Sequence, residues 1–229
     1  METPPGPERV SRRLREQFAP AYLAISGLVQ VLVLDALIAR VEGDYTEYGA
    51  VEWLVAVATF LVCVDIWHEY LMTVLSHVWL PGLLDSLVPF AFLVSELLMV
   101  HFVGEDLRGW LLGYGLVALV GVAAWAQRNL RIRQFADEER DVPLALAARH
   151  WYRGALAVAV TAFGLLGWLL YDALGLESAQ LAVAVAGLAG VVVIIASSVP
   201  MWNEILRYAR GEPVGTDRSG RASRTDRSR

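Results

Sequence analysis

The chain has 229 residues, of which 56% are hydrophobic and 19% charged, and its formal net charge is −5. The hydrophobic residues gather into blocks of about 20, the length that a helix needs to cross a bilayer, which excludes an ordinary soluble domain. All 19 basic residues are Arg, so a retinal Schiff base to Lys is excluded, and the single Cys63 excludes a disulfide framework.

The pattern predicts an all-α integral membrane protein, a bundle of six transmembrane helices that occupies residues 18–210. In chain order the predicted spans are residues 20–38, 49–79, 83–103, 108–126, 150–171 and 179–201. The second span meets no helix breaker before Pro81, so its helix has to tilt or project from the bilayer. We expect disorder in the basic segment 1–17 and in the tail 211–229, and an amphipathic cytoplasmic loop over residues 127–149.

The distribution of Arg predicts the orientation. With both termini inside, every Arg except Arg40 and Arg108 lies on the cytoplasmic side, as the positive-inside rule requires. We therefore expect a multi-pass protein of the cell membrane with cytoplasmic N- and C-termini. The expected partners are the lipid bilayer and anionic lipid headgroups at the cytoplasmic face, with a homo-oligomer left open and no nucleic acid.

The second span carries an unusual group of ionisable residues. Asp65, His68 and Glu69 are spaced at i, i+3 and i+4, which places them on one face of a helix. If the second and third spans form an antiparallel hairpin, Glu96 comes level with Asp65 and His68. The same arithmetic brings His77 level with Asp85, nearer the cytoplasmic end. The prediction is a polar seam between these two helices, formed by Asp65, His68, Glu69, Glu96, His77 and Asp85.

Carboxylates inside a membrane are costly, about 2.5 to 3.5 kcal/mol each on insertion scales, and so they suggest a function. Carboxyl groups this close would not all stay ionised, and shared protons suit a proton or cation pathway. Three alternatives remain: hydrogen bonds that only hold the bundle together, a metal site, and a haem between His68 and His101. No HExxH or paired ExxH spacing supports a metal, and the two histidines lie at different depths, so metal and cofactor stay unassigned.

Two further groups are interpreted structurally. His150 to Arg153 has the composition of an interfacial anchor, and the segment around Pro200 that contains Ser197, Ser198 and Glu204 is interpreted as a kinked helix end.

The functional hypothesis is a small transporter or channel-like protein for protons or cations. The alternative is a non-catalytic scaffold that binds a partner through its Arg-rich loop and tail. A membrane enzyme acting on lipid stays a third alternative, without assigned catalytic residues.

Overall fold

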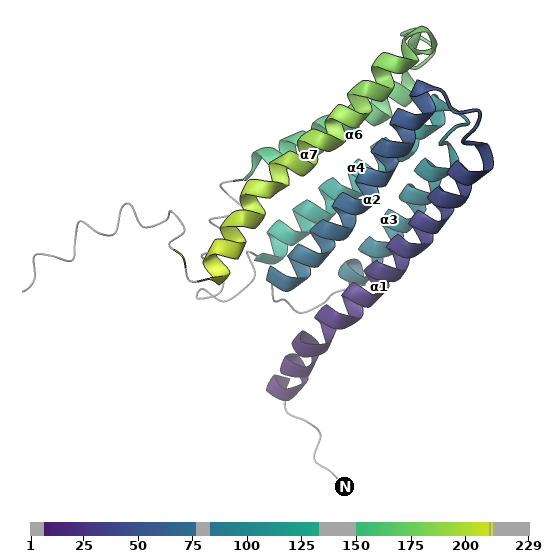
Figure 1. Ribbon diagram of the computed structural model, residues 1–229. Coiled ribbons are helices and arrows are strands. Elements are labelled where there is room, and N and C mark those ends of the chain that lie inside the picture. Colours follow the sequence, from purple (N-terminus) through teal and green to yellow (C-terminus); the bar gives the residue numbers. More distant parts are fainter. Residues whose placement is uncertain (1–6, 77–82, 133–149, 211, 213–229) are drawn as a thin grey trace, which may run out of the picture.

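The computed structural model describes residues 7–76, 83–132, 150–210 and 212, and within them it leaves aside the side chains of 7–16, 75–76, 131–132 and 208–209. This part of the chain is helical and contains no strand (Figure 1). Its elements are α1 (Pro7–Asp44), α2 (Ala50–Ser76), α3 (Leu83–His101), α4 (Leu107–Ile132), α6 (Tyr152–Leu169), the short 3₁₀ helix η1 (Leu176–Ala179) and α7 (Gln180–Ala209).

Six of the described helices are long and apolar enough to cross a membrane, which supports the predicted all-helical, multi-pass membrane fold. Large apolar side chains also remain exposed on their outer faces, for example Leu28, Val94 and Leu169. Water would make such surfaces costly, whereas lipid tails solvate them.

Some helix limits differ from the predicted ones. Helix α1 begins at Pro7, so residues 7–17, which were expected to be disordered, are helical and Pro20 lies inside the helix. Helix α4 continues to Ile132, six residues beyond the predicted end of the fourth span. Good helix formers such as Arg, Gln and Leu at both places explain the extensions. The remainder of the predicted amphipathic loop, 133–149, and nearly all of the tail lie outside the described residues.

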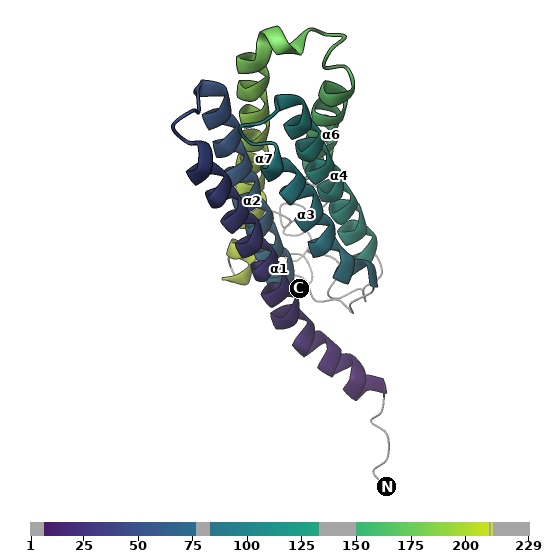
Figure 2. The same ribbon diagram turned by 90° about the vertical axis from the view of Figure 1, so that its right-hand side faces the viewer.

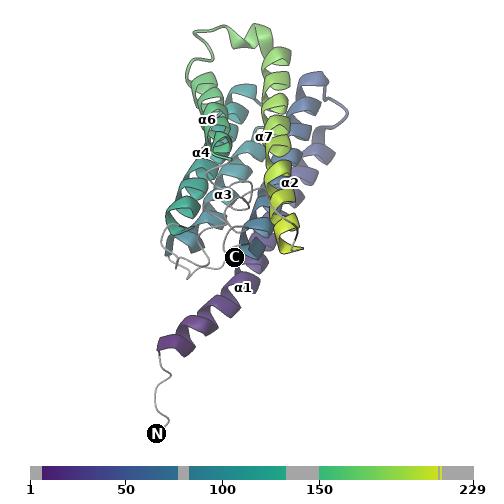
Figure 3. The ribbon, with the colours of Figure 1, turned by 90° about the vertical axis from the view of Figure 1, so that its left-hand side faces the viewer.

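The helices form two layers of three (Figure 2). In one layer α2 packs between α1 and α7, and in the other α4 packs between α3 and α6. The layers meet at both edges, where α1 contacts α3 and α6 contacts α7. Helices α2 and α3, consecutive in the chain, thus belong to different layers. Helix α1 starts and α7 finishes at the same end of the bundle, here called the termini end, and the opposite end is called the loop end (Figure 3).

Glycines bring the backbone of α4 against both of its neighbours. A Cβ on Gly113 would lie 2.5 Å from the Cα of Met99 in α3, and one on Gly164 of α6 would lie 2.6 Å from the Cα of Gly115. Small residues thus allow close helix contact on both sides of α4, through Gly113 toward α3 and through Gly115 toward α6. These contacts fix α4 as the middle of its layer.

Neutral hydrogen bonds join the two layers in the half of the bundle nearer the loop end. The indole Nε1 of Trp110 in α4 donates to Thr59 Oγ1 in α2 at 2.9 Å, and the Tyr114 hydroxyl donates to the Gly187 carbonyl in α7 at 3.1 Å. The rings of Trp110 and Tyr114 are stacked with centroids 4.9 Å apart. Buried hydrogen-bonded aromatics of this size fill the space between the layers here.

Candidate functional site

A cavity of about 220 Å³ lies between the two layers, in the half of the bundle nearer the termini end. Apolar and aromatic side chains from both layers form most of its wall, among them Ile66, Phe92 and Val117. Its charged or amide-bearing lining residues come from α2, α3, α4 and α6, and they are Asp65, Glu69, Asp85, Gln127, Arg128 and Arg153. A membrane protein that places ionisable groups around an internal cavity has the anatomy of a binding site or of a pathway.

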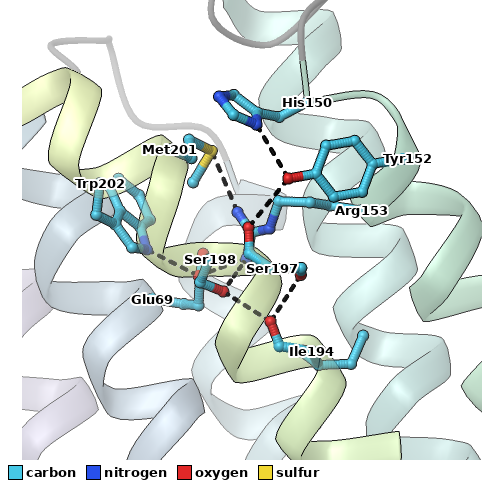
Figure 4. A network of polar contacts seen from close by, with 9 residues as sticks. All are labelled: Glu69, His150, Tyr152, Arg153, Ile194, Ser197, Ser198, Met201 and Trp202. Atoms are coloured by element: carbon cyan, nitrogen blue, oxygen red, sulfur yellow. Dashed lines mark hydrogen bonds and ion pairs between the residues drawn. The ribbon is translucent and has the colours of Figure 1, made fainter.

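The strongest polar contact at the cavity is an ion pair between the layers (Figure 4). Arg153 Nη2 of α6 lies 2.6 Å from Glu69 Oε1 of α2, and the same oxygen accepts a hydrogen bond from Trp202 Nε1 of α7 at 3.0 Å. Arg153 also donates to Ser198 Oγ at 2.5 Å and contacts the Met201 sulfur at 3.2 Å. One guanidinium thereby connects α2, α6 and α7.

The local structure of α7 explains why it can receive this arginine. Pro200 lies inside the helix and has no N–H, so one backbone carbonyl of the preceding turn loses its helical partner. The hydroxyls of Ser197 and Ser198 bond back to the Ile194 carbonyl at 2.7 and 3.2 Å, which satisfies these buried groups within the helix. The Ser198 oxygen remains available to accept from Arg153.

The start of α6 differs from the predicted interfacial anchor. Trp151 is 66% exposed and fits the anchor, but His150 and Arg153 are only 6% and 9% exposed and face inward. His150 Nδ1 lies 3.3 Å from the Tyr152 hydroxyl (Figure 4). The Nε2 of His150 lies 3.2 Å from Glu204 Oε2. Of these four residues only Trp151 is exposed, a distinction that composition alone could not make.

Asp65 occupies a different environment from Glu69, although both line the cavity. Its carboxyl group makes no hydrogen bond and no ion pair within the part of the chain that the structure describes, whereas Glu69 is held by Arg153 and Trp202. The two acids are one helical turn apart on α2. The two acids of the cavity are therefore not equivalent, since one is paired and the other is not.

Comparison with known proteins gives no match. No protein-family model fits the chain, and no curated protein and no solved structure matches it significantly. The geometry of the cavity is therefore the observation that bears on function.

The structure divides the predicted seam into separate sites. Asp65, Glu69 and Asp85 line the cavity, but His68 packs edge-on against Trp202, with ring centroids 6.0 Å apart, and does not line it. His77 lies outside the described residues. His68 and Glu69 thus both contact Trp202 of α7, but only Glu69 also reaches the cavity.

Glu96 and Asp85 have amide partners that the prediction did not name. Both oxygens of Glu96, a fully buried residue, accept hydrogen bonds from Gln30 Nε2 of α1 at 3.1 Å, and Glu96 does not line the cavity. Asp85 Oδ1 accepts from Gln127 Nε2 of α4 at 2.6 Å. Glu96 also meets α2 through the Cys63 thiol, close to the predicted level, whereas the predicted alignment of Asp85 with His77 lies outside the described residues. Asp85, Pro89 and Glu96 all belong to the buried face of α3.

The sequence interpretation missed the arginines and amides of the site. Arg128 and Arg153 were assigned to a loop and to an interfacial anchor, and Gln30 and Gln127 were given no role. The sequence did contain one indication of their role. A carboxylate within a membrane requires a cationic or hydrogen-bond-donating partner, and these arginines and glutamines lie within or next to the apolar spans. In the described ranges no group of three or more His, Cys, Asp and Glu side chains could hold a metal ion.

Proposed function

We propose that this protein is a membrane transporter that moves protons through its six-helix bundle, with Asp65 as the group that gains and loses the proton. The observation that carries the proposal is the unpaired carboxyl of Asp65 at the wall of an internal cavity. Its α2 neighbour Glu69 is neutralised by Arg153, so the two acids are not equivalent. Inequivalent carboxyl groups at one site are a common basis for directed proton transfer.

The arrangement suggests how a proton could change the structure. Asp65 and Glu69 stand one turn apart, and Arg153 of α6 faces both. Arg128 of α4 and Asp85 of α3 line the same cavity and complete its charged groups. When Asp65 is ionised, it competes with Glu69 for Arg153, and when it is protonated, the Glu69 pair is undisturbed. Protonation at one residue thereby changes a contact between the two layers.

The geometry favours protons over metal cations as the transported ion. Arg128 and Arg153 line the cavity beside the carboxylates, and two guanidinium groups repel a metal cation that enters. Of the sequence-predicted pathway residues, Glu96 and His68 contact other helices and not the cavity. The proposed pathway therefore consists of Asp65 and Glu69, with Asp85 near them.

The proposal includes an orientation with both termini in the cytoplasm, in the cell membrane, because it leaves only Arg40 and Arg108 outside. The cavity then lies in the cytoplasmic half of the bundle. Arg residues at the termini end would contact anionic lipid headgroups.

Proton flux in proteoliposomes tests the proposal. We expect an imposed pH gradient to collapse faster with the wild-type chain than in empty liposomes, and Asp65→Asn to return the rate to the empty-liposome level. Glu96→Gln is the matched comparison, because it neutralises an equally embedded carboxyl that does not line the cavity, and it should keep the flux. Undiminished flux in Asp65→Asn would overturn the proposal, and loss of flux in Glu96→Gln alone would place the pathway elsewhere.

The scaffold alternative concerns the Arg-rich residues of the loop and tail, which lie largely outside the described ranges, and so it stays a prediction. Deletion of residues 211–229 separates the two hypotheses. The transport proposal expects flux to survive the deletion, whereas the scaffold alternative expects the cellular role to be lost.

A further inference from the structure

The cavity wall contains hydrogen-bond donors that the protein itself does not satisfy. Arg128 makes no hydrogen bond or ion pair among the described residues, and its buried Nε has no partner. The Nε of Arg153 and the hydroxyl of Tyr70, both at the cavity, are also buried without partners. A guanidinium nitrogen can only donate, so whatever satisfies Arg128 must be an acceptor.

The carboxylates of the cavity do not supply this acceptor. Glu69 is occupied by Arg153 and Trp202, and Asp85 accepts from Gln127 at 2.6 Å. Asp65 forms no hydrogen bond or ion pair with a described residue, and the arginine whose charge acts on it is Arg153. Arg128 feels the charge of Glu69 but has no hydrogen-bonded acceptor among the described residues, so it is the cavity arginine that lacks a direct partner.

The remaining wall is suited to an apolar group. Aliphatic and aromatic residues of both layers, such as Val62, Phe92 and Val191, surround the cavity away from its charged residues. The volume of about 220 Å³ is below the range of about 300–1,000 Å³ that is typical of sites for drug-sized ligands. A ligand that fits must be small, which excludes a lipid with two acyl chains.

We propose that the cavity binds a small amphipathic anion, a carboxylate on a short hydrocarbon or aromatic body, with Arg128 as its anchor. The carboxylate accepts from the free guanidinium of Arg128, while the apolar body lies against the aliphatic wall. We infer that this anion is carried together with the proton, and this transport role rests on the proposed function. Binding of the anion to the cavity is independent of the proposed function.

Binding is tested on the full chain purified in detergent, by thermal unfolding and by isothermal titration calorimetry. The probes are octanoate, octylamine and octanol, which share one hydrocarbon body and differ in the charge of the head. We expect octanoate to raise the unfolding temperature in a concentration-dependent way, because it binds the folded state, and the other two to raise it much less. Dioleoyl phosphatidic acid in mixed micelles tests a membrane lipid as the source of the anion, and it should not compete with octanoate.

Two variants make the test specific. Arg128→Gln should weaken octanoate binding at least about tenfold, since a hydrogen bond to a charged group is lost. Arg207→Gln is the matched control, because Arg207 is an exposed arginine near the same end, paired with Glu212 and outside the cavity. Gly121→Leu adds a side chain where a Cβ meets no atom within 4 Å, so it should fill the cavity and abolish binding without harming the fold.

The outcomes separate this inference from the proposed function. Equal or tighter binding of octylamine, or octanoate binding that survives both Arg128→Gln and Gly121→Leu, overturns the amphipathic-anion site. Competition by phosphatidic acid assigns the site to lipid and likewise overturns the small ligand. Octanoate binding without proton flux supports the anion site and overturns the transport proposal. Proton flux without octanoate binding supports the transport proposal and overturns the anion site.

Discussion

Arg153 of α6 and Glu69 of α2, 84 residues apart in the chain, meet at 2.6 Å between the two layers of the bundle. Both side chains are largely removed from solvent, so neither charge can be left alone at low cost. The pair lies at the wall of the cavity, and it is therefore both a structural link and part of the proposed pathway.

Removal of one partner of this pair should destabilise the protein strongly. We expect Glu69→Leu or Arg153→Met to lower the free energy of unfolding by about 3–5 kcal/mol, because each leaves a buried charge uncompensated. The double variant should lose less than the sum of the two single losses. Denaturant unfolding in mixed micelles measures the cycle, and purely additive losses would show that the two side chains do not interact. Asp172→Asn, at the exposed ion pair with Arg108, is the control and should cost less than about 1 kcal/mol.

A side chain at Gly164 should separate α4 from α6. Its Cβ would lie 2.6 Å from the backbone of Gly115, a distance that only movement of a helix can relieve. We expect Gly164→Leu to reduce the folded yield and the unfolding temperature sharply, as measured by size-exclusion chromatography and a thermal melt. Gly27→Leu is the matched control, because a Cβ at Gly27 meets no atom within 4 Å. Similar behaviour of the two variants would contradict the close contact.

Loss of the amide at Gln30 should affect stability and not transport. Gln30→Leu leaves the fully buried Glu96 with only the weak Cys63 thiol as a donor, and we expect a loss of about 1–3 kcal/mol in the free energy of unfolding. Further replacement of Glu96 by Leu should recover part of this loss, because no polar group then remains unsatisfied. Denaturant titration of the single and double variants provides the measurement. A double variant less stable than Gln30→Leu would argue that Glu96 has another essential partner.

Arg40 should not be replaceable by Lys. Its Nε donates to the Val103 carbonyl at 2.7 Å, and its two terminal nitrogens pair with Asp44 at 3.2 Å and Glu105 at 2.6 Å. A lysine ammonium cannot reproduce this three-way geometry. Because the site is partly exposed, we expect Arg40→Lys to cost only about 1–2 kcal/mol, measured as a lower unfolding temperature. An unchanged unfolding temperature would mean that the Arg40 contacts at the loop end do not stabilise the fold.

The proposed orientation can be tested with introduced cysteines. The native Cys63 is buried, so it should contribute little background to labelling by a membrane-impermeant maleimide. We expect a cysteine at Ser178, near the loop end, to be labelled in intact cells, and a cysteine at Ser219 in the tail to be labelled only after the cells are broken. The reverse pattern would invert the topology and place the cavity in the outer half of the bundle.

The sequence was sufficient to predict the membrane-spanning helices but not to predict which helices pack against each other. Blocks of apolar residues predict six spans because the bilayer imposes one length and one composition on each of them. Which helices touch depends on particular surfaces, such as the Gly115 and Gly164 contact, and on the path of α1 between its two partners. The assumption that α2 and α3 form a packed hairpin followed from their order in the chain, and the two-layer arrangement overrides it.

Because the sequence does not show how the helices pack, it predicted only part of the site. The acids Asp65, Glu69 and Asp85 were recognisable because they stand inside apolar runs, where any charge is conspicuous. Arg153 and Arg128 were not, because they lie at the ends of spans, where basic residues ordinarily meet headgroups. Only the depth and rotation of α6 and α4 show that these two arginines face the cavity.

The two layers are joined by different kinds of bond at different depths. Trp110 with Thr59, and Tyr114 with the Gly187 carbonyl, are neutral pairs whose strength does not depend on proton concentration in the physiological range. Glu69 with Arg153, nearer the termini end, is an ionic pair that a single proton on the carboxylate would weaken. A change in proton concentration can therefore weaken the contact between the layers near the termini end while the contact near the loop end stays intact. The two layers could then separate at one end and rotate about the other.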